Sequence, residues 1–194
     1  ELDSTGVFQQ MAENAEIYYA EFDETTGTFR NITKVTNNAD CDMMPRIIEN
    51  GDEIVVAWVR NDAKSLMQEE GTNSICMAKR SASGFEKEEI LTTASGTIDN
   101  YMVYQDETGI QSAFVGESNQ VKAVFDTNGN VFQEFAELMT EADDGTITSL
   151  HYASGKIGCI LNGKLYQYDI VEKKLEAYDA GEDSFGGQGR YCRN

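Results

Sequence analysis

Three aspartates stand at comparable places along the chain and could act together. Asp42, Asp99 and Asp144 each come just before a stretch that we expect to be an inner β-strand, in the connection that enters a new repeat. Carboxylates gathered in neighbouring loops can bind Ca²⁺ with carbonyl and water ligands, or attract a cationic group. Aspartate also stabilises loops by bonding its own backbone, so a purely structural role is the alternative. Ca²⁺ is the one metal that this pattern predicts, and no other cofactor is expected.

Side chains for other catalytic chemistry are scarce. His151 is the single histidine, and no nucleophile stands at a spacing that ties it to a Ser-His-Asp or Cys-His arrangement. The cysteines form no CxxC pair, so a structural zinc site is not expected; they are Cys41, Cys76, Cys159 and Cys192. Cys76 and Cys159 lie in expected strands and are predicted to be buried apolar side chains, while the pairing of the four thiols stays open. No catalytic residue is assigned.

The chain is strongly acidic, which limits its partners. It has 34 Asp and Glu residues against 15 Lys and Arg residues, a net charge of −19. Such a surface repels nucleic-acid phosphates and anionic lipid headgroups. The longest apolar runs, such as Ile54–Val59, are too short to cross a bilayer, and the acidic first residues do not resemble a signal peptide. We therefore expect no nucleic acid and no membrane insertion, whereas cationic ligands and basic proteins are compatible; solubility alone is the simpler role of the charge.

Two markers repeat along the chain and indicate a tandem all-β fold. Turn glycines occur at Gly6, Gly51, Gly109 and Gly155, which are 45, 58 and 46 residues apart. β-Hairpins are predicted to begin at Ile17, Ile75, Val121 and Leu165, which are 58, 46 and 44 residues apart. Repeats of this length with several short strands each are typical of β-propeller blades. We predict one propeller domain over 1–194, with four-stranded antiparallel blades over about 1–38, 39–94, 95–140 and 141–180 and a further strand in 181–194.

Each blade is expected to have an inner pair of strands followed by the outer hairpin. The innermost strands are predicted at 44–48, 101–104 and 146–152, and the second strands at 7–11, 54–59, 110–115 and 157–161. The outer hairpins are predicted at 17–22 with 29–36, 75–78 with 85–92, 121–125 with 131–138, and 165–168 with 175–178. Alignment of the second strands gives Met11, Trp58, Phe114 and Leu161 the same position, so these side chains are predicted to stack together where the blades converge. Trp58 is therefore expected in the core, with a ligand platform as its alternative role.

The ends of the chain do not coincide with the repeat boundaries. The first blade lacks an innermost strand, and Gly189–Cys192 stands where the next one is due. The last strand could complete the first blade and close a small four-bladed ring. Alternatively, the chain is a segment of a seven- or eight-bladed ring, completed by further blades of the same propeller or by a second copy in a homodimer. The segment is the arrangement that we favour.

The second repeat contains an insertion with candidate ligand-binding residues. From turn glycine to hairpin the four repeats take 11, 24, 12 and 10 residues. The extra residues fall in Asp62–Asn73, where 64–70 is predicted to form one or two helical turns. Insertions in repeat proteins map to loops on one face, which is often the binding face, although loops also lengthen at little thermodynamic cost. The predicted ligand contacts are Asp62, Lys64, Met67 and Glu69 of this loop, together with Trp58.

Two stretches carry a resemblance to a known class of proteins. Tyr18–Asp23 with Phe29 and Ile32–Asn38, and Pro45–Ile47 with Val55–Trp58, resemble the repeats of secreted bacterial β-propeller proteins. Asp23–Phe29 is also similar to the Asp-box of sialidases, SxDxGxTW, but it has an extra residue and Phe in place of Trp, so no sialidase activity follows. The propeller resemblance implies a non-catalytic binding or scaffold module, extracellular or at the cell surface, with a protein or carbohydrate ligand on the loop-rich face. The alternative is part of a carbohydrate-active enzyme of the glycoside-hydrolase kind, with carboxylates in the central channel.

Overall fold

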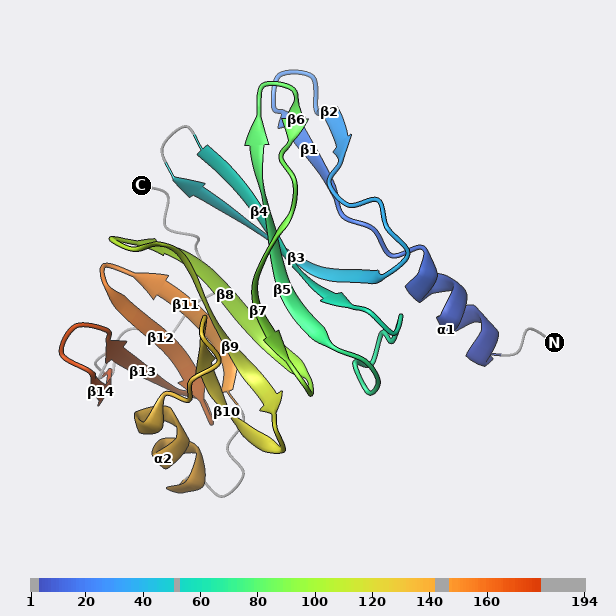
Figure 1. The fold of residues 1–194 in the computed structure, drawn as a ribbon. Helices are drawn as coiled ribbons and strands as arrows, with labels where there is room; N and C mark the ends of the chain where they lie inside the picture. The colour runs from blue at the N-terminus through green and yellow to red at the C-terminus, as the bar shows by residue number, and fades with distance from the viewer. Residues whose placement is uncertain (1–3, 51–52, 142–146, 179–194) are drawn as a thin grey trace.

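The computed structural model describes residues 4–50, 53–141 and 147–178, and in these ranges the fold is all-β with two short helices (Figure 1). The strands are β1 (Tyr18–Asp23), β2 (Thr28–Lys34), β3 (Cys41–Asn50), β4 (Glu53–Asn61), β5 (Asn73–Ser81), β6 (Gly84–Phe85), β7 (Glu89–Ala94), β8 (Ile98–Asp106), β9 (Gly109–Ser118), β10 (Val121–Asp126), β11 (Ile147–Ala153), β12 (Lys156–Leu161), β13 (Lys164–Asp169) and β14 (Lys174–Ala177). The helices are α1 (Ser4–Glu13) and α2 (Gln133–Glu141). Within these ranges, neither helix is long and apolar enough to cross a membrane.

The strands form four antiparallel sheets, each built from strands that are neighbours in the chain. The sheets are β1–β2, then β3–β4–β5 with β6 and β7 both paired to β5, then β8–β9–β10, and last β11–β12–β13–β14. Short turns suffice for this order, and in the first hairpin Gly27 has a φ of 67° and donates its N–H to the carbonyl of Asp23 over 2.8 Å. That left-handed conformation strains residues that carry a Cβ, so glycine suits the turn.

Most of the predicted strands are confirmed. The hairpins predicted in the first, second and fourth repeats are present as β1–β2, β5–β7 and β13–β14. The second strands of the last three repeats are β4, β9 and β12, and the innermost strands are β3, β8 and β11. The alternation of side chains along these strands buries Val55, Ala57 and Val59 toward one neighbouring sheet and Val56 and Trp58 toward the other.

Two of the predicted strands are wrong. Val7–Met11 lies in α1, and the predicted return strand 131–138 is replaced by α2 after a single bridge between Phe125 and Val131. The sequence of α2 places Phe135 and Met139 four residues apart, so both lie on one helix face, and both are buried in the core. The glutamines and alanine of α1 also favour a helix. These local preferences prevail over the repeat.

Apolar cores lie between successive sheets, and this arrangement corrects the predicted central stack. Trp58 packs between the first and second sheets, Phe114 between the second and third, and Leu161 between the third and fourth. All three are buried, as predicted, but they do not contact one another as a stack, and Met11 is exposed on α1. Side chains stand perpendicular to their sheet, so residues at the equivalent position each face the preceding sheet instead of a common axis.

Candidate ligand-binding surface

The three innermost strands share a β-bulge that is not predictable from the sequence. Each of β3, β8 and β11 is the end strand of its sheet and has a β-bulge near its beginning. The register shifts lie between Met43 and Arg46, between Ile98 and Asn100, and between Ile147 and Ser149. A bulge bends a strand and re-aims its side chains. The same distortion therefore recurs at the same place in three sheets.

Asn100 ties these three strands together at their bulges. Its side-chain oxygen accepts a hydrogen bond from Nη2 of Arg46 on β3 at 3.2 Å, and its Nδ2 donates to the carbonyl of Thr148 on β11 at 3.2 Å. The guanidinium of Arg46 also lies 5.7 Å from the ring centre of Tyr101, whose hydroxyl donates to the carbonyl of Met44 at 2.7 Å. Polar side chains thus form hydrogen bonds with some of the backbone carbonyls along the strand edges that meet there.

The inserted loop of the second repeat is anchored next to this point. The side chain of Gln68 bonds Ile98 as a neighbouring strand would: Oε1 accepts from the backbone N–H at 2.7 Å, and Nε2 donates to the carbonyl at 3.1 Å. At the base of the loop, Asn61 and Asn73 are buried and bonded to each other at 2.9 Å. Asn61 also accepts from the N–H of Ser65 at 2.7 Å. The insertion therefore has a defined shape and borders the bulge of β8.

The loop has no helical turns, which corrects the prediction for 64–70. Lys64 and Gln68 both have a φ of 59°, in the left-handed region that a right-handed helix does not use. The predicted contacts divide into two groups. Asp62 accepts from the N–H of Thr72 at 2.7 Å, and Lys64 lies 3.8 Å from Glu13 of α1, so both have structural partners. Met67, which is 71% exposed, and the exposed Glu69 face solvent.

Asp42 is not a metal ligand in this structure, because protein donors surround its carboxylate. Its side chain is completely buried. Oδ1 accepts from Nε1 of Trp58 at 2.8 Å and from Nε of Arg60 at 2.9 Å, while Oδ2 accepts from Nδ2 of Asn38 at 2.8 Å. Trp58 is likewise fully buried and unable to serve as a ligand platform. The predicted roles of Asp42 in a Ca²⁺ site and of Trp58 in ligand binding are therefore corrected.

Arg60 links this buried aspartate to a second carboxylate. Its two terminal nitrogens donate to the two oxygens of Glu88 at 2.5 and 2.6 Å, a bidentate pair. These hydrogen bonds lower the pKa of Glu88, and together with the bond to Asp42 they raise the pKa of Arg60, against the effect of burial. The chain Trp58–Asp42–Arg60–Glu88 is a structural ion network at one end of the second sheet.

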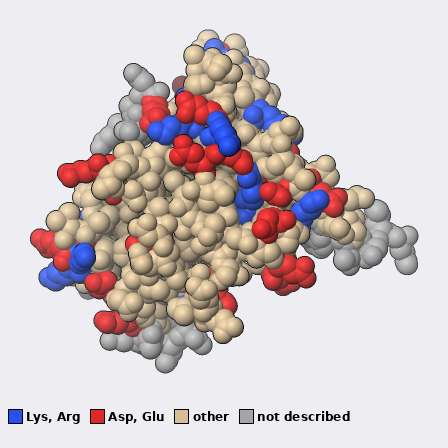
Figure 2. All heavy atoms as spheres, viewed as in Figure 1, with Lys and Arg blue, Asp and Glu red and all other residues tan. Residues whose placement is uncertain are grey.

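Within the described residues, Asp42 and Asp99 do not belong to any three-residue group that could hold a metal ion. Asp99 is exposed at the bulge of β8, and Asp144 lies outside the described residues. Across residues 4–50, 53–141 and 147–178, no group of three or more His, Cys, Asp or Glu side chains is arranged to hold a metal ion. In Figure 2 a band of acidic and basic side chains crosses the upper part of the view, and the area below it, where Figure 1 draws β8 and β9, is largely free of charge.

His151 and the thiols have environments that fit structural roles. His151 is exposed on β11, with its ring over Gly158 of the neighbouring strand, where any Cβ would collide with it. Cys41, Cys76 and Cys159 are buried free thiols. Burial raises the pKa of Cys41 to about 11 and that of Cys76 and Cys159 to about 12, so all three stay protonated at neutral pH. The predicted burial of Cys76 and Cys159 is confirmed.

These thiols are expected to resist alkylation while the chain is folded. The thiolate is the reactive form, and burial removes both access and ionisation. In a Cys192→Ser background, iodoacetamide at about pH 8 should modify none of the three within a time that fully modifies the urea-unfolded chain. Mass spectrometry of the intact protein measures the outcome. Rapid labelling of Cys41, Cys76 or Cys159 under native conditions would contradict the packing described here.

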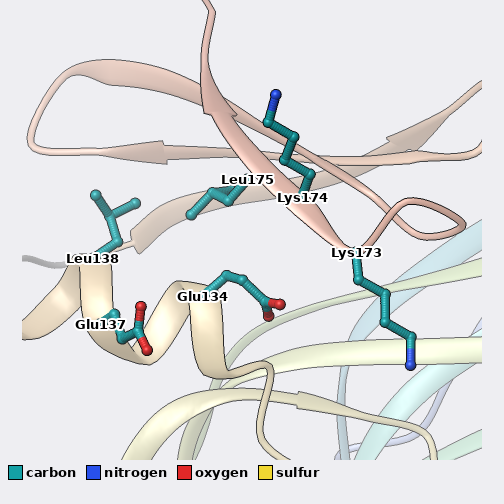
Figure 3. A pocket seen from close by; sticks show the side chains of 6 residues that line it. All are labelled: Glu134, Glu137, Leu138, Lys173, Lys174 and Leu175. Carbon is teal, nitrogen blue, oxygen red and sulfur yellow. The ribbon is translucent and has the colours of Figure 1, made fainter.

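A surface pocket of about 340 Å³ lies between α2 and the end of the last sheet. Figure 3 shows Glu134 and Glu137 extending from the helix, and Leu138 and Leu175 between the two walls. Its lining residues are Glu134, Glu137, Leu138, Lys173, Lys174 and Leu175. This lining holds no paired nucleophile and base, and the two lysines point away from each other (Figure 3). Sequence reasoning missed the pocket because it requires α2, which was predicted as a strand.

The chain was compared with protein-family models and with curated protein sequences. No protein-family model matches the chain, and no curated protein sequence matches it.

Proposed function

We propose that this chain is a non-catalytic binding module of the β-propeller kind, which binds a protein or glycan through the face that bears the inserted loop. The propeller is supported by four antiparallel sheets that pack in chain order and by the bulge shared by β3, β8 and β11. In a propeller, the innermost strands line the axis, which fits three end strands joined through Asn100. A location outside the cell or at its surface is part of this proposal, and rests on the resemblance of the repeats.

The anchored loop is the observation that carries the binding proposal. Gln68 and the pair Asn61–Asn73 hold the loop in one shape, so little conformational entropy is lost when a partner binds. Met67 projects from it into solvent, and methionine side chains adapt well to apolar partner surfaces. The exposed Glu69 and Glu70 beside it favour a partner with basic groups around an apolar centre.

A carbohydrate-active enzyme is the weaker proposal. It needs carboxylates in the central channel, and one of the three that were considered, Asp42, is buried in hydrogen bonds to Trp58, Arg60 and Asn38. A paired acid and base for glycoside cleavage must reach the substrate. Asp99 is the remaining exposed candidate among the described residues.

The binding proposal predicts that a single substitution at the loop tip weakens ligand binding. A displayed peptide library and a glycan array would each be screened with the folded chain, and Met67→Asp would then be measured against every ligand selected. We expect affinity to fall about tenfold or more, because the change places a charge at the centre of the contact. Titration calorimetry gives the dissociation constants.

Val171→Asp is the matched control, because Val171 is 87% exposed in the β13–β14 turn. It should leave affinity unchanged. Ligands that bind Met67→Asp as well as the original chain would refute the loop face as the binding site. Hydrolysis of an arrayed glycan that disappears in Asp99→Asn would instead support the enzyme.

A further inference from the structure

The first sheet has one face that nothing in the described residues covers. The β1–β2 hairpin packs one side on the second sheet, where Tyr19 and Ile17 meet Trp58. On its other side four large apolar side chains are exposed: Tyr18 at 60%, Phe22 at 54%, Phe29 at 67% and Ile32 at 67%. We call these four residues the outer face. Figure 1 shows the hairpin at one end of the row of sheets.

The strand register explains why these side chains gather on one side. Phe22 is directly opposite Phe29 across the hairpin, and their ring centres are 5.3 Å apart. Tyr18 lies opposite Lys34, whose ammonium is 6.0 Å from the tyrosine ring centre. The residues between them on β1, Tyr19 and Glu21, belong to the covered side. Strand alternation therefore places the outer face on one side of the hairpin, across the register shift between Tyr19 and Glu21.

The outer face is also neutral, which is unusual on this protein. The whole chain has a net charge of −19, so most contacts between two copies would bring carboxylates together. Lys34 lies beside the outer face, opposite Tyr18, and its charge is already balanced by Glu16 at 3.1 Å. A second copy can approach here without burying an unpaired carboxylate, and it needs no complementary charge.

The exposed area is large for a monomer and suits a small dimer interface. Aromatic side chains have roughly 150–250 Å² of surface each, so at these exposures the four residues offer roughly 400–500 Å². Contiguous apolar patches above a few hundred Å² usually mark an interaction site. Two such patches bury roughly 900 Å², and their rims bring the total toward the roughly 1,200 Å² at which specific interfaces begin.

We propose that the outer face is the interface of a homodimer, in which two β1–β2 hairpins pack face to face about a two-fold axis. Such an isologous contact sets each patch against its own copy, so a neutral apolar surface is complementary to itself. The proposal is independent of the ligand on the loop-rich face, because Met67 lies in the loop between β4 and β5 and the outer face lies on β1 and β2. Either proposal can fail without the other.

Analytical ultracentrifugation of the 194-residue chain tests this proposal. We expect a concentration-dependent monomer–dimer equilibrium whose dissociation constant falls as NaCl rises from about 50 to about 500 mM, because salt screens the repulsion between two acidic copies while the apolar contact remains. A dimer held by ion pairs would respond in the opposite direction. Phe29→Asp should weaken dimerisation on the order of 100-fold, since it buries a charge in the contact.

Controls keep the result interpretable. Phe29 is exposed in the monomer, so Phe29→Asp should keep the fold, which circular dichroism checks; Ile32→Asp is the second variant if it does not. Val171→Asp adds the same charge away from the outer face and should dimerise like the original chain. A chain that stays monomeric at the highest concentration, or a dimer unaffected by both Phe29→Asp and Ile32→Asp, overturns the proposal.

Discussion

Replacing Asp42 by alanine is expected to lower the free energy of unfolding by about 3–5 kcal/mol, the range measured when one partner of a buried ion pair is removed. The substitution would remove the buried partner of the Arg60 guanidinium, which would keep Glu88 and the more exposed Asp40, and would leave the buried N–H of Trp58 without its acceptor. Urea denaturation followed by tryptophan fluorescence measures this loss well. Trp58 is the only tryptophan in the chain, and its indole belongs to the network.

Two further variants distinguish a structural role of Asp42 in the buried network from a role as a Ca²⁺ ligand. Asp99→Ala removes an exposed carboxylate that was assigned to the same Ca²⁺ site, and should change the unfolding free energy by no more than about 0.5 kcal/mol. Asp42→Asn keeps an acceptor for Trp58 but loses the charge that faces Arg60, so its loss should lie between the other two. If Ca²⁺ stabilised the original chain and Asp42→Ala removed that effect, Asp42 would be a metal ligand after all.

The strands were predictable because local patterns and long-range packing agree in them. Ile54–Val59 and Ile157–Leu161 are rich in β-branched and apolar residues, and each becomes a central strand of its sheet. The first packs against core on both faces, and the second buries Ile157, Cys159 and Leu161 on one face. The hairpin turns are rich in Gly, Asn, Asp and Ser for the same local reason. These features depend on a few consecutive residues, which a single sequence displays directly.

The repeat alignment predicts strands where the two helices lie, although the local sequence of each favours a helix. In 131–138 the spacing of Phe135 and Leu138 or Met139 matches a helix face, but the third repeat required a strand there. The structure uses α2 to close the core between the last two sheets. Repeat alignment gives the expected position of an element, whereas the periodicity of its apolar residues indicates whether it is a helix or a strand. In 131–138 the periodicity is the better guide.

The candidate site was predicted only at the level of its loop. The insertion length pointed to 62–73, and a loop is present there, without the helical turns predicted for 64–70. Nothing in the sequence places Gln68 against Ile98 or Asn100 between two other strands, because both contacts join segments about 30 to 54 residues apart. For Asp42 one signal was available: Trp58 and Arg60 lie on the neighbouring strand, and both are hydrogen-bond donors for a buried carboxylate.

A methyl group at Gly116 is expected to cost about 3 kcal/mol of stability, in the upper range of overpacking effects. Gly116 lies opposite Ile98 on the paired strand, where a Cβ would overlap the carbonyl oxygen of Thr97 and come within 3.0 Å of the Cα of Ile98. Both obstacles are backbone atoms, so no side-chain rotation relieves the clash. Thr97 must move, and its hydrogen bond from the N–H of Glu117, now 2.8 Å, is stretched or lost.

The displacement in Gly116→Ala should also reach the inserted loop. The backbone N–H of Ile98 donates to Oε1 of Gln68, so a shifted Ile98 releases the anchor of the loop, and its amide hydrogen should exchange faster than in the original chain. Hydrogen exchange and urea denaturation together measure both effects. Gly6→Ala is the control: apart from its chain neighbours and the backbone of its own helix, no heavy atom lies within 4 Å of its Cβ position. Alanine in α1 should stabilise the helix by up to about 1 kcal/mol. Unchanged stability of the Gly116→Ala variant would show that β8 and β9 do not approach as closely as the bulge requires, and the shared bulge would then lose its value as support for the propeller.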